Sequence, residues 1–239
     1  MFSGKSILVT GGTGSFGSKF VPMTLRKYNP SRIIIYSRDE MKQWEMGQQY
    51  KKFNNVRFFI GDVRDRERLY RALTGVDLVV HAAATKIVPT AEYNPSECIK
   101  TNIIGAQNII EAAIEKNVNK VLALSTDKAV APINLYGATK LCSDKLFLTS
   151  NKFTKNSTLY SVVRYGNVIG SRGSVIPYFL SLPKNTKIPL TSERMTRFII
   201  FLQDAIKFSF LALEKMQGGE IFVKKLPSVK IKHIAEVIR

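Results

Sequence analysis

The feature that most constrains the fold is a run of glycines close to the N-terminus. Gly11, Gly14 and Gly17 are spaced as GxxGxxG, directly after the apolar run Lys5–Thr10 and before a helical pattern that reaches about Lys27. In a strand–turn–helix unit, the first glycine permits the tight turn, the second admits a pyrophosphate and the third lets the helix pack on the strand. The helix N-terminus adds N–H groups and a positive dipole end. This placement indicates a dinucleotide-binding unit.

Strand-like and helix-like segments alternate along the 239 residues. The further predicted strands are Arg32–Tyr36, Val56–Ile60, Val76–His81, Val121–Leu124, Leu159–Arg164 and Glu220–Val223, and the clearest further helices are Glu97–Lys116, Asp204–Met216 and Val229–Arg239. The alternation predicts an α/β fold with a Rossmann-like, doubly wound parallel sheet. We expect residues 1–168 to form the dinucleotide-binding domain with the catalytic residues, and residues 169–239 to form a partly interleaved substrate-binding part.

The end of the second strand carries the signal for cofactor choice. Ser37 and Arg38 come first, followed by Asp39, Glu40 and Lys42. An acidic residue here binds the ribose 2′-OH of NAD, whereas an arginine accommodates the 2′-phosphate of NADP. The order favours NADP, and Asp39 keeps NAD open. The other residues expected at the cofactor are Thr13, Ser15, Phe16, Asp62, Val63, Ala82, Ala83, Ala84, Asn102, Tyr165, Asn167 and Val168; for Asp62, a turn-forming role is equally open.

The candidate catalytic residues follow the strand Val121–Leu124. Ser125, Thr126, Asp127 and Lys128 come at its carboxyl end, where open α/β sheets bind ligands. Tyr136 and Lys140 are four residues apart, which places them on one helix face. The Lys140 ammonium is expected to lower the pKa of the Tyr136 phenol. The alternative for this pair is an exposed helix face.

The composition bounds the remaining possibilities. Lys and Arg total 36 against 18 Asp and Glu, but they are dispersed, so we expect no specific nucleic-acid partner. No apolar run is long enough to span a bilayer, and no usual signal peptide is present, which predicts a cytoplasmic protein without a membrane partner. The two cysteines, Cys98 and Cys142, form no metal-ligand cluster, so no metal is expected.

The motifs TGGTGSFG, HAAA, STDKA, YGATK and RYGNVIGSRGS together resemble the extended short-chain dehydrogenase/reductase superfamily. More narrowly, Asp127–Lys128 after Ser-Thr, with SRDE and NPSECIKTN, is similar to the inverting UDP-N-acetylglucosamine 4,6-dehydratases that begin pseudaminic acid synthesis. The resemblance implies NADP as cofactor, UDP-N-acetylglucosamine as substrate and a homo-oligomer, either a dimer or a hexamer. Relatives continue beyond the end of this chain, so we expect the substrate-binding part to be incomplete.

The resemblance also implies a role for each catalytic residue. Tyr136, helped by Lys140, takes the C4 hydroxyl proton, Lys128 removes the C5 proton, and Asp127 donates a proton to the departing C6 hydroxyl. Thr126 contacts the C4 oxygen. The expected substrate-side residues are Lys86, Ser125, Thr126, Asn167, Arg172, Ser174, Val175, Thr191 and Arg197, of which Arg172 suits a phosphate and Arg197 is as readily structural. The alternatives are a UDP-sugar 4-epimerase and a non-catalytic NADP-binding fragment.

Overall fold

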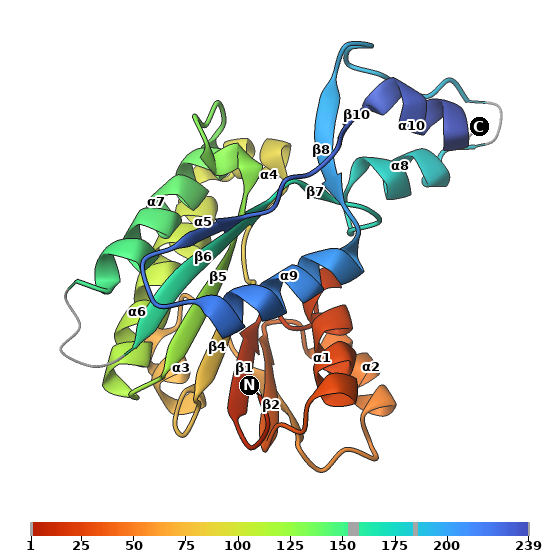
Figure 1. Ribbon diagram of the computed structural model, residues 1–239. Coiled ribbons are helices and arrows are strands. Elements are labelled where there is room, and N and C mark those ends of the chain that lie inside the picture. The colour runs from red at the N-terminus through yellow and green to blue at the C-terminus, as the bar shows by residue number, and fades with distance from the viewer. Residues whose placement is uncertain (1, 153–157, 184–185, 239) are drawn as a thin grey trace.

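The computed structural model describes residues 2–152, 158–183 and 186–238, and its core is one parallel sheet (Figure 1). The strands of this sheet are β1 (Ser6–Thr10), β2 (Arg32–Ser37), β3 (Val56–Ile60), β4 (Leu78–His81), β5 (Lys120–Thr126), β6 (Leu159–Tyr165) and β9 (Ile221–Val223). Their order is β3-β2-β1-β4-β5-β6-β9, and every neighbouring pair is parallel. The predicted doubly wound parallel sheet is confirmed.

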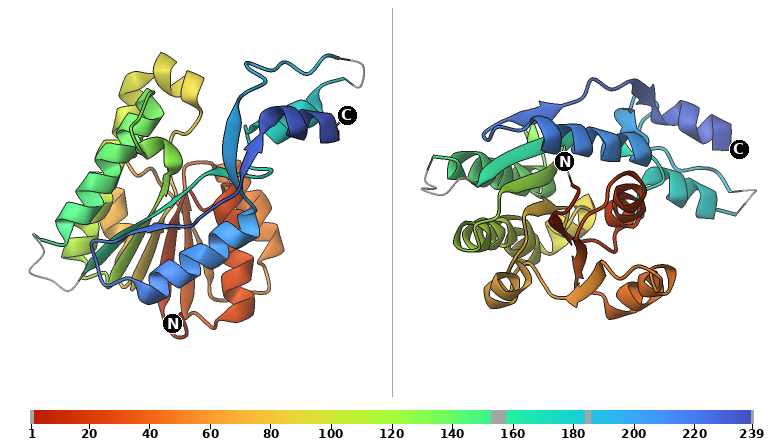
Figure 2. Two further views of the ribbon diagram at one scale, coloured as in Figure 1. Left: turned by 45° about the horizontal axis from the view of Figure 1, so that its top comes forward. Right: turned by 60° about the horizontal axis from the view of Figure 1, so that its bottom comes forward.

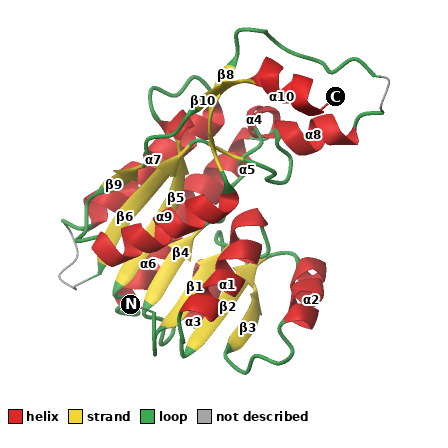
Figure 3. Cartoon of the chain, turned by 45° about the vertical axis from the view of Figure 1, so that its right-hand side comes forward, coloured by secondary structure: helices red, strands yellow, loops and turns green. Residues whose placement is uncertain are grey.

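Helices cover both faces of the sheet. They are α1 (Ser15–Lys27), α2 (Glu40–Gln49), α3 (Arg66–Ala72), α6 (Gly105–Glu115), α7 (Leu135–Ser150) and α9 (Leu202–Lys215). Leu8 and Val121 pack in a core with α3, α6 and α7, whereas Ile7 and Leu122 pack on the opposite side with α1 and α9 (Figure 3). Because neighbouring strand residues are buried on opposite faces, the strands are continuous apolar runs.

The predicted helix Glu97–Lys116 is interrupted. The structure has α4 (Val88–Tyr93), α5 (Pro95–Ile99), the π-helical segment η1 (Lys100–Ile104) and then α6. Asn102 in η1 is buried, and its side chain bonds both backbone groups of Thr85 and the hydroxyl of Thr139. The wider π-helical turn therefore contains the residue, Asn102, whose side chain links this helix to Thr85 and to Thr139 of α7.

Five elements form a small lobe beyond the carboxyl ends of the strands. They are β7 (Asn167–Val168), α8 (Val175–Ser181), β8 (Thr196–Ile200), β10 (Ser228–Lys230) and α10 (Ile231–Ile238). Strands β10, β8 and β7 make a separate sheet, and the lobe stands off from the main sheet in both views of Figure 2. The prediction that Val229 begins a helix is wrong, because Val229 pairs with Arg197 of β8; Arg239, its predicted end, lies outside the described residues.

The small lobe and the main sheet are interleaved along the chain. Helix α9 and strand β9 follow β8 in the sequence but belong to the layers of the main sheet, before β10 and α10 return to the lobe. The lobe has its own apolar cluster, in which Phe179 of α8 packs with Ile231 and Ala235 of α10. No helix in the described ranges combines the length and apolar character needed to cross a membrane.

Candidate active site

A cavity of about 960 Å³ lies between the carboxyl ends of the strands and the small lobe. The predicted cofactor-side residues on its wall are Gly11, Thr13, Gly14, Ser15, Phe16, Ser37, Arg38, Asp39, Lys42, Asp62, Val63, Ala82, Ala83, Ala84, Tyr136, Lys140, Tyr165, Asn167 and Val168. The predicted substrate-side and catalytic residues on the same wall are Lys86, Ser125, Thr126, Lys128, Arg172, Ser174, Val175, Thr191 and Arg197. Fold topology thus brings residues from both halves of the chain to one site.

The glycine turn leaves its backbone open to the cavity. Gly11 has φ +63°, and a Cβ there would lie 2.9 Å from the Cα of Ala83. Gly14 is the N-cap of α1 and has no side-chain cap, so N–H groups of the first helical turn remain for a ligand. A Cβ on Gly17 would lie 2.1 Å from the Gly12 carbonyl oxygen, which is why Gly17 serves helix–strand packing outside the cavity wall.

The far end of the cavity is formed after β2 and β3. Asp39 is the N-cap of α2: its carboxylate accepts a bond from the Lys42 N–H at 2.9 Å and forms an ion pair with the Lys42 ammonium. This carboxylate is therefore already engaged. The Arg38 side chain is 62% exposed and lies 3.6 Å from the Asp62 carboxylate. Asp62 also accepts hydrogen bonds from the backbone and the side chain of Arg64. Asp62 therefore stabilises the turn after β3 and also lines the cavity.

A polar chain closes the cavity floor at the end of β5. Asp127 starts the short helix η2 (Asp127–Ala129), and its carboxylate accepts bonds from the Thr126 hydroxyl at 3.0 Å and from the Lys128 ammonium at 3.1 Å. Lys128 also donates to the Asn167 side-chain oxygen at 3.0 Å. Lys128 and Asn167 line the cavity, whereas Asp127 is not part of its wall. The Lys128 ammonium and the Asp127 carboxylate therefore form a hydrogen-bonded ion pair.

Tyr136 and Lys140 lie on the first turns of α7. Asn134 caps this helix by accepting the Gly137 N–H at 2.8 Å. Burial raises the pKa of the Tyr136 phenol to about 12, although a hydrogen bond with Thr126 opposes the shift. The pKa of Tyr136 is therefore raised in the protein alone, not lowered as expected, and burial is the main cause. Lys140 is itself only 2% exposed, and burial lowers the pKa of its ammonium.

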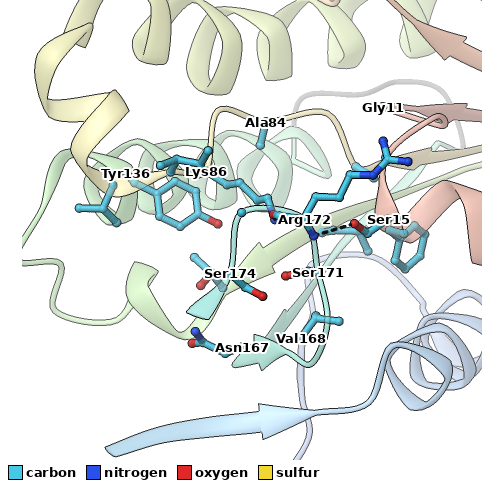
Figure 4. A pocket seen from close by; sticks show the side chains of 18 of the residues that line it. Gly11, Ser15, Ala84, Lys86, Tyr136, Asn167, Val168, Ser171, Arg172 and Ser174 are labelled. Carbon is cyan, nitrogen blue, oxygen red and sulfur yellow. Dashed lines mark hydrogen bonds between the residues drawn. The ribbon is translucent and has the colours of Figure 1, made fainter. Parts of the chain in front are cut away.

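The glycine-rich loop after β7 crosses the cavity mouth between two contacts. The Arg172 N–H donates to the Ser15 hydroxyl at 3.2 Å, and the Lys86 ammonium donates to the Arg172 carbonyl oxygen at 2.9 Å. Figure 4 shows this loop between the start of α1 and the segment after β4. Burial lowers the pKa of Lys86. Arg38, Lys42, Lys86, Lys128, Lys140, Arg172 and Arg197 all line the cavity, and basic side chains of this kind bind phosphates.

Four predicted site residues, Gly17, Glu40, Asn102 and Asp127, are not on the cavity wall. Asn102 is 1% exposed, and its side-chain amide bonds the backbone of Thr85 and the hydroxyl of Thr139. Glu40, in the first turn of α2, does not line the cavity either. Both lie close in sequence to residues of the wall, but helix geometry directs them elsewhere.

The sequence interpretation missed the apolar part of the cavity wall. It is formed by Tyr36, Ile87, Val88, Pro89, Leu124, Tyr178, Phe179, Pro189, Leu190, Met195, Leu202 and Ile231. Several of these belong to the small lobe, whose two short strands β7 and β10 gave no periodic signal. Among the described residues, no group of three or more His, Cys, Asp or Glu side chains is placed to hold a metal ion.

Comparisons with known proteins agree with this architecture. Residues 7–239 match the family described as polysaccharide biosynthesis protein. The chain is 57% identical to a Campylobacter jejuni protein named UDP-N-acetylglucosamine 4,6-dehydratase (inverting), with all of this chain and 72% of that protein covered. It is 42% identical to a Rickettsia canadensis protein named UDP-glucose 4-epimerase, over all of this chain and 71% of the relative. The X-ray structure of Pen from Bacillus thuringiensis superposes with a TM-score of 0.96 at 38% identity, covering 99% of this chain and 74% of that one.

Proposed function

The chain belongs to the polysaccharide biosynthesis protein family, within the short-chain dehydrogenase/reductase superfamily, and we propose that it is an NADP-dependent UDP-N-acetylglucosamine 4,6-dehydratase that inverts C5. The observation that carries this proposal is the Asp127–Lys128 pair at the end of β5, hydrogen-bonded at 3.1 Å beside Tyr136. A 4-epimerase removes and returns a hydride at one carbon and needs no second acid–base pair. The proposed product is UDP-2-acetamido-2,6-dideoxy-β-L-arabino-hexos-4-ulose, a precursor for pseudaminic acid.

The cavity fits a nicotinamide dinucleotide. The uncapped start of α1 and the small residues Ala82–Ala84 allow close approach of a pyrophosphate. The choice of NADP is supported by the engagement of Asp39, which caps α2 and pairs with the Lys42 ammonium, because the exposed Arg38 is then the charged group available at that end. When bound, the nicotinamide supplies a hydride acceptor for C4 of the sugar and a hydride donor for C6.

In the proposed mechanism, the residues of α7 act on the C4 hydroxyl. Tyr136 accepts its proton as the hydride leaves, with the Thr126 hydroxyl as a hydrogen-bond partner and the Lys140 ammonium beneath. A free phenol with a pKa of about 12 is a poor base at neutral pH. A bound cofactor with a cationic ring would favour the phenolate in the complex. We therefore expect Tyr136 to act only after the cofactor is bound.

Elimination needs the opposite protonation states from those in the hydrogen-bonded pair. Moving one proton along the existing Lys128–Asp127 bond leaves a neutral amine and a carboxylic acid. The amine can then remove the C5 proton, which the C4 ketone has acidified, while the acid protonates the C6 hydroxyl that leaves as water. With a hydride returned to C6, a solvent-derived proton adds to the opposite face of C5 and gives the inverted product. Substrate binding excludes water, and exclusion of water favours the uncharged pair. Because Asp127 is not part of the cavity wall, its carboxyl group has to move to reach C6.

The test is incubation of the protein with UDP-N-acetylglucosamine and NADP⁺ in deuterated water, followed by NMR. The expected product is the 6-deoxy-4-keto sugar with deuterium at C5 and the L-arabino configuration. An unlabelled 4-epimer would instead support the epimerase, and an unchanged sugar would contradict both activities.

Lys128→Ala separates the two half-reactions. Because Lys128 acts after C4 oxidation, this variant should show transient absorbance of reduced nicotinamide in rapid mixing, without 6-deoxy product. Lys145→Ala, at an exposed position of α7, is the matched control and should behave as the parent. If oxidation also fails in Lys128→Ala, Lys128 is not a dedicated base for C5.

A further inference from the structure

A buried carboxylate that the proposed mechanism does not use lies one helical turn beyond Lys140. Asp144 is completely buried, and its Oδ2 accepts bonds from the Ser125 hydroxyl at 2.9 Å and from Arg164 Nε at 2.8 Å. The hydrogen-bond partners come from β5 and β6, which lie beside α7 in the fold (Figure 1). Three elements therefore fix the position of this one carboxylate.

The hydrogen bonds of Asp144 are incomplete. Its Oδ1 is buried and has no hydrogen-bond partner among the described residues. An ionised oxygen that is buried without a donor is costly, unless a nearby positive charge stabilises it. Arg164 supplies one such charge, and its side chain is 15% exposed. The other nearby cation is Lys140, four residues earlier on α7, which makes no direct ion pair with Asp144 among the described residues.

Lys140 and Asp144 occupy positions i and i+4 of α7, so they share one helix face. Burial alone disfavours the charged form of Lys140 and lowers its pKa, and the Asp144 charge opposes that shift. The other ionisable groups that face Lys140 or its partner Tyr136 are His81 of β4, Tyr165 of β6, Cys98 of α5 and Asp127 of η2. Of these, His81 is a buried imidazole that is neutral at neutral pH.

We propose that Asp144 is a positioning residue for the reaction: its carboxylate keeps the buried Lys140 ammonium charged beneath Tyr136, and Ser125 and Arg164 hold that carboxylate in place. In this proposal Ser125 has a different role from the expected substrate contact, because its hydroxyl donates a hydrogen bond to the Asp144 carboxylate. The inference rests on the proposed function for its catalytic consequence, whereas the coupling between Asp144 and Lys140 is a property of the protein alone.

The coupling can be measured without cofactor or substrate. Protein carrying ¹³C-labelled lysine is titrated by NMR, and the Lys140 signal is assigned by its loss in Lys140→Met. In Asp144→Asn, the Lys140 midpoint should move to lower pH than in the parent, because the stabilising charge is gone. Asp144→Glu should restore a midpoint close to the parent. Ser143→Ala is the matched control, since Ser143 is a buried neighbour whose hydroxyl has no partner among the described residues.

Asp144→Asn leaves Arg164 without its partner, so this variant can lose its fold. Asp144→Asn/Arg164→Met removes both charges of the ion pair, and its Lys140 midpoint should also lie below that of the parent. A parent-like Lys140 midpoint in either folded variant would overturn the proposal and leave Asp144 as a structural partner of Arg164.

Catalysis supplies the second readout. If the parent is active, the alkaline limb of the pH profile for C4 oxidation should move to lower pH in Asp144→Asn, in step with the Lys140 midpoint, because Tyr136 loses its charged neighbour earlier. An unmoved limb would overturn the catalytic part of the proposal. A parent without dehydratase activity would remove the proposed function, while the NMR titration would still decide the coupling.

Discussion

Acid should destabilise this protein through one buried histidine. His81 ends β4, is 1% exposed, and its Nδ1 lies 2.9 Å from the Thr10 hydroxyl. The oxygen of Thr10 accepts the N–H groups of Ala82 and Ala83, so its own hydrogen is directed to Nδ1. The imidazole must therefore be neutral with Nδ1 unprotonated. Burial, with the nearby Lys140 charge, lowers the pKa of His81 from 6.5 to about 3.

The magnitude follows from proton linkage. Between pH 6.5 and about pH 3 the unfolded chain binds a proton at His81 that the folded protein does not, so the free energy of unfolding falls as the pH falls through this window. Each pH unit contributes about 1.36 kcal/mol. At pH 5, one and a half units below the unfolded pKa, the loss from His81 is about 2 kcal/mol.

Urea denaturation at pH 7 and pH 5 measures the loss. His81→Asn removes the titrating group, so its decrease in unfolding free energy between the two pH values should be about 2 kcal/mol smaller than that of the parent. The chain contains two histidines, and the other, His233, is exposed on α10. His233→Asn is thus the matched control and should lose as much stability as the parent. An equal loss in parent and His81→Asn would refute the reasoning.

Further predictions concern the cofactor turn and the catalytic segment. Arg38→Ala should weaken NADP binding about tenfold, the value of one exposed charge-assisted contact of about 1.4 kcal/mol, and spare NAD, as measured by fluorescence titration; equal losses for both would contradict NADP selection. Gly11→Ala should lower the unfolding free energy by at least about 1 kcal/mol, since alanine at φ +63° is strained and its Cβ would lie 2.9 Å from facing backbone; parent-like urea denaturation would contradict this. Gly137→Ala should reduce kcat strongly, because its Cβ would lie 2.2 Å from the Lys128 carbonyl oxygen. An unchanged kcat in Gly137→Ala would contradict the proposed crowding. Gly47→Ala is the control, because its Cβ would lie no nearer than 3.7 Å to another atom, and it should stabilise α2 by about 0.5–1 kcal/mol.

The sequence alone determined the features that depend on short-range geometry. The tight turn requires a glycine at position 11 whatever the rest of the chain does, and the strand-then-helix alternation requires a parallel sheet. The i,i+4 spacing of Tyr136 and Lys140 likewise survives any tertiary arrangement of their helix. The placement of Asp127 and Lys128 at a strand end was fixed by the apolar run before them.

Tertiary structure decided which distant groups meet and what burial does to them. Lys128 hydrogen-bonds Asn167 because the segments after β5 and β6 lie side by side. Asp144 hydrogen-bonds Ser125 and Arg164, which are on these same neighbouring strands. No periodicity encodes such pairings, since they depend on strand order and register. The interruption at Asn102 has the same origin, for its partner Thr139 lies in another helix.

The direction of a pKa shift is also a tertiary property. From spacing alone, Lys140 should lower the pKa of Tyr136, yet the fold raises it to about 12, chiefly because burial removes water from around the phenol. Spacing in the sequence predicts which charged groups are neighbours. Only the packed structure determines how much water remains around them, and that water sets the interaction energy between the charges in the site.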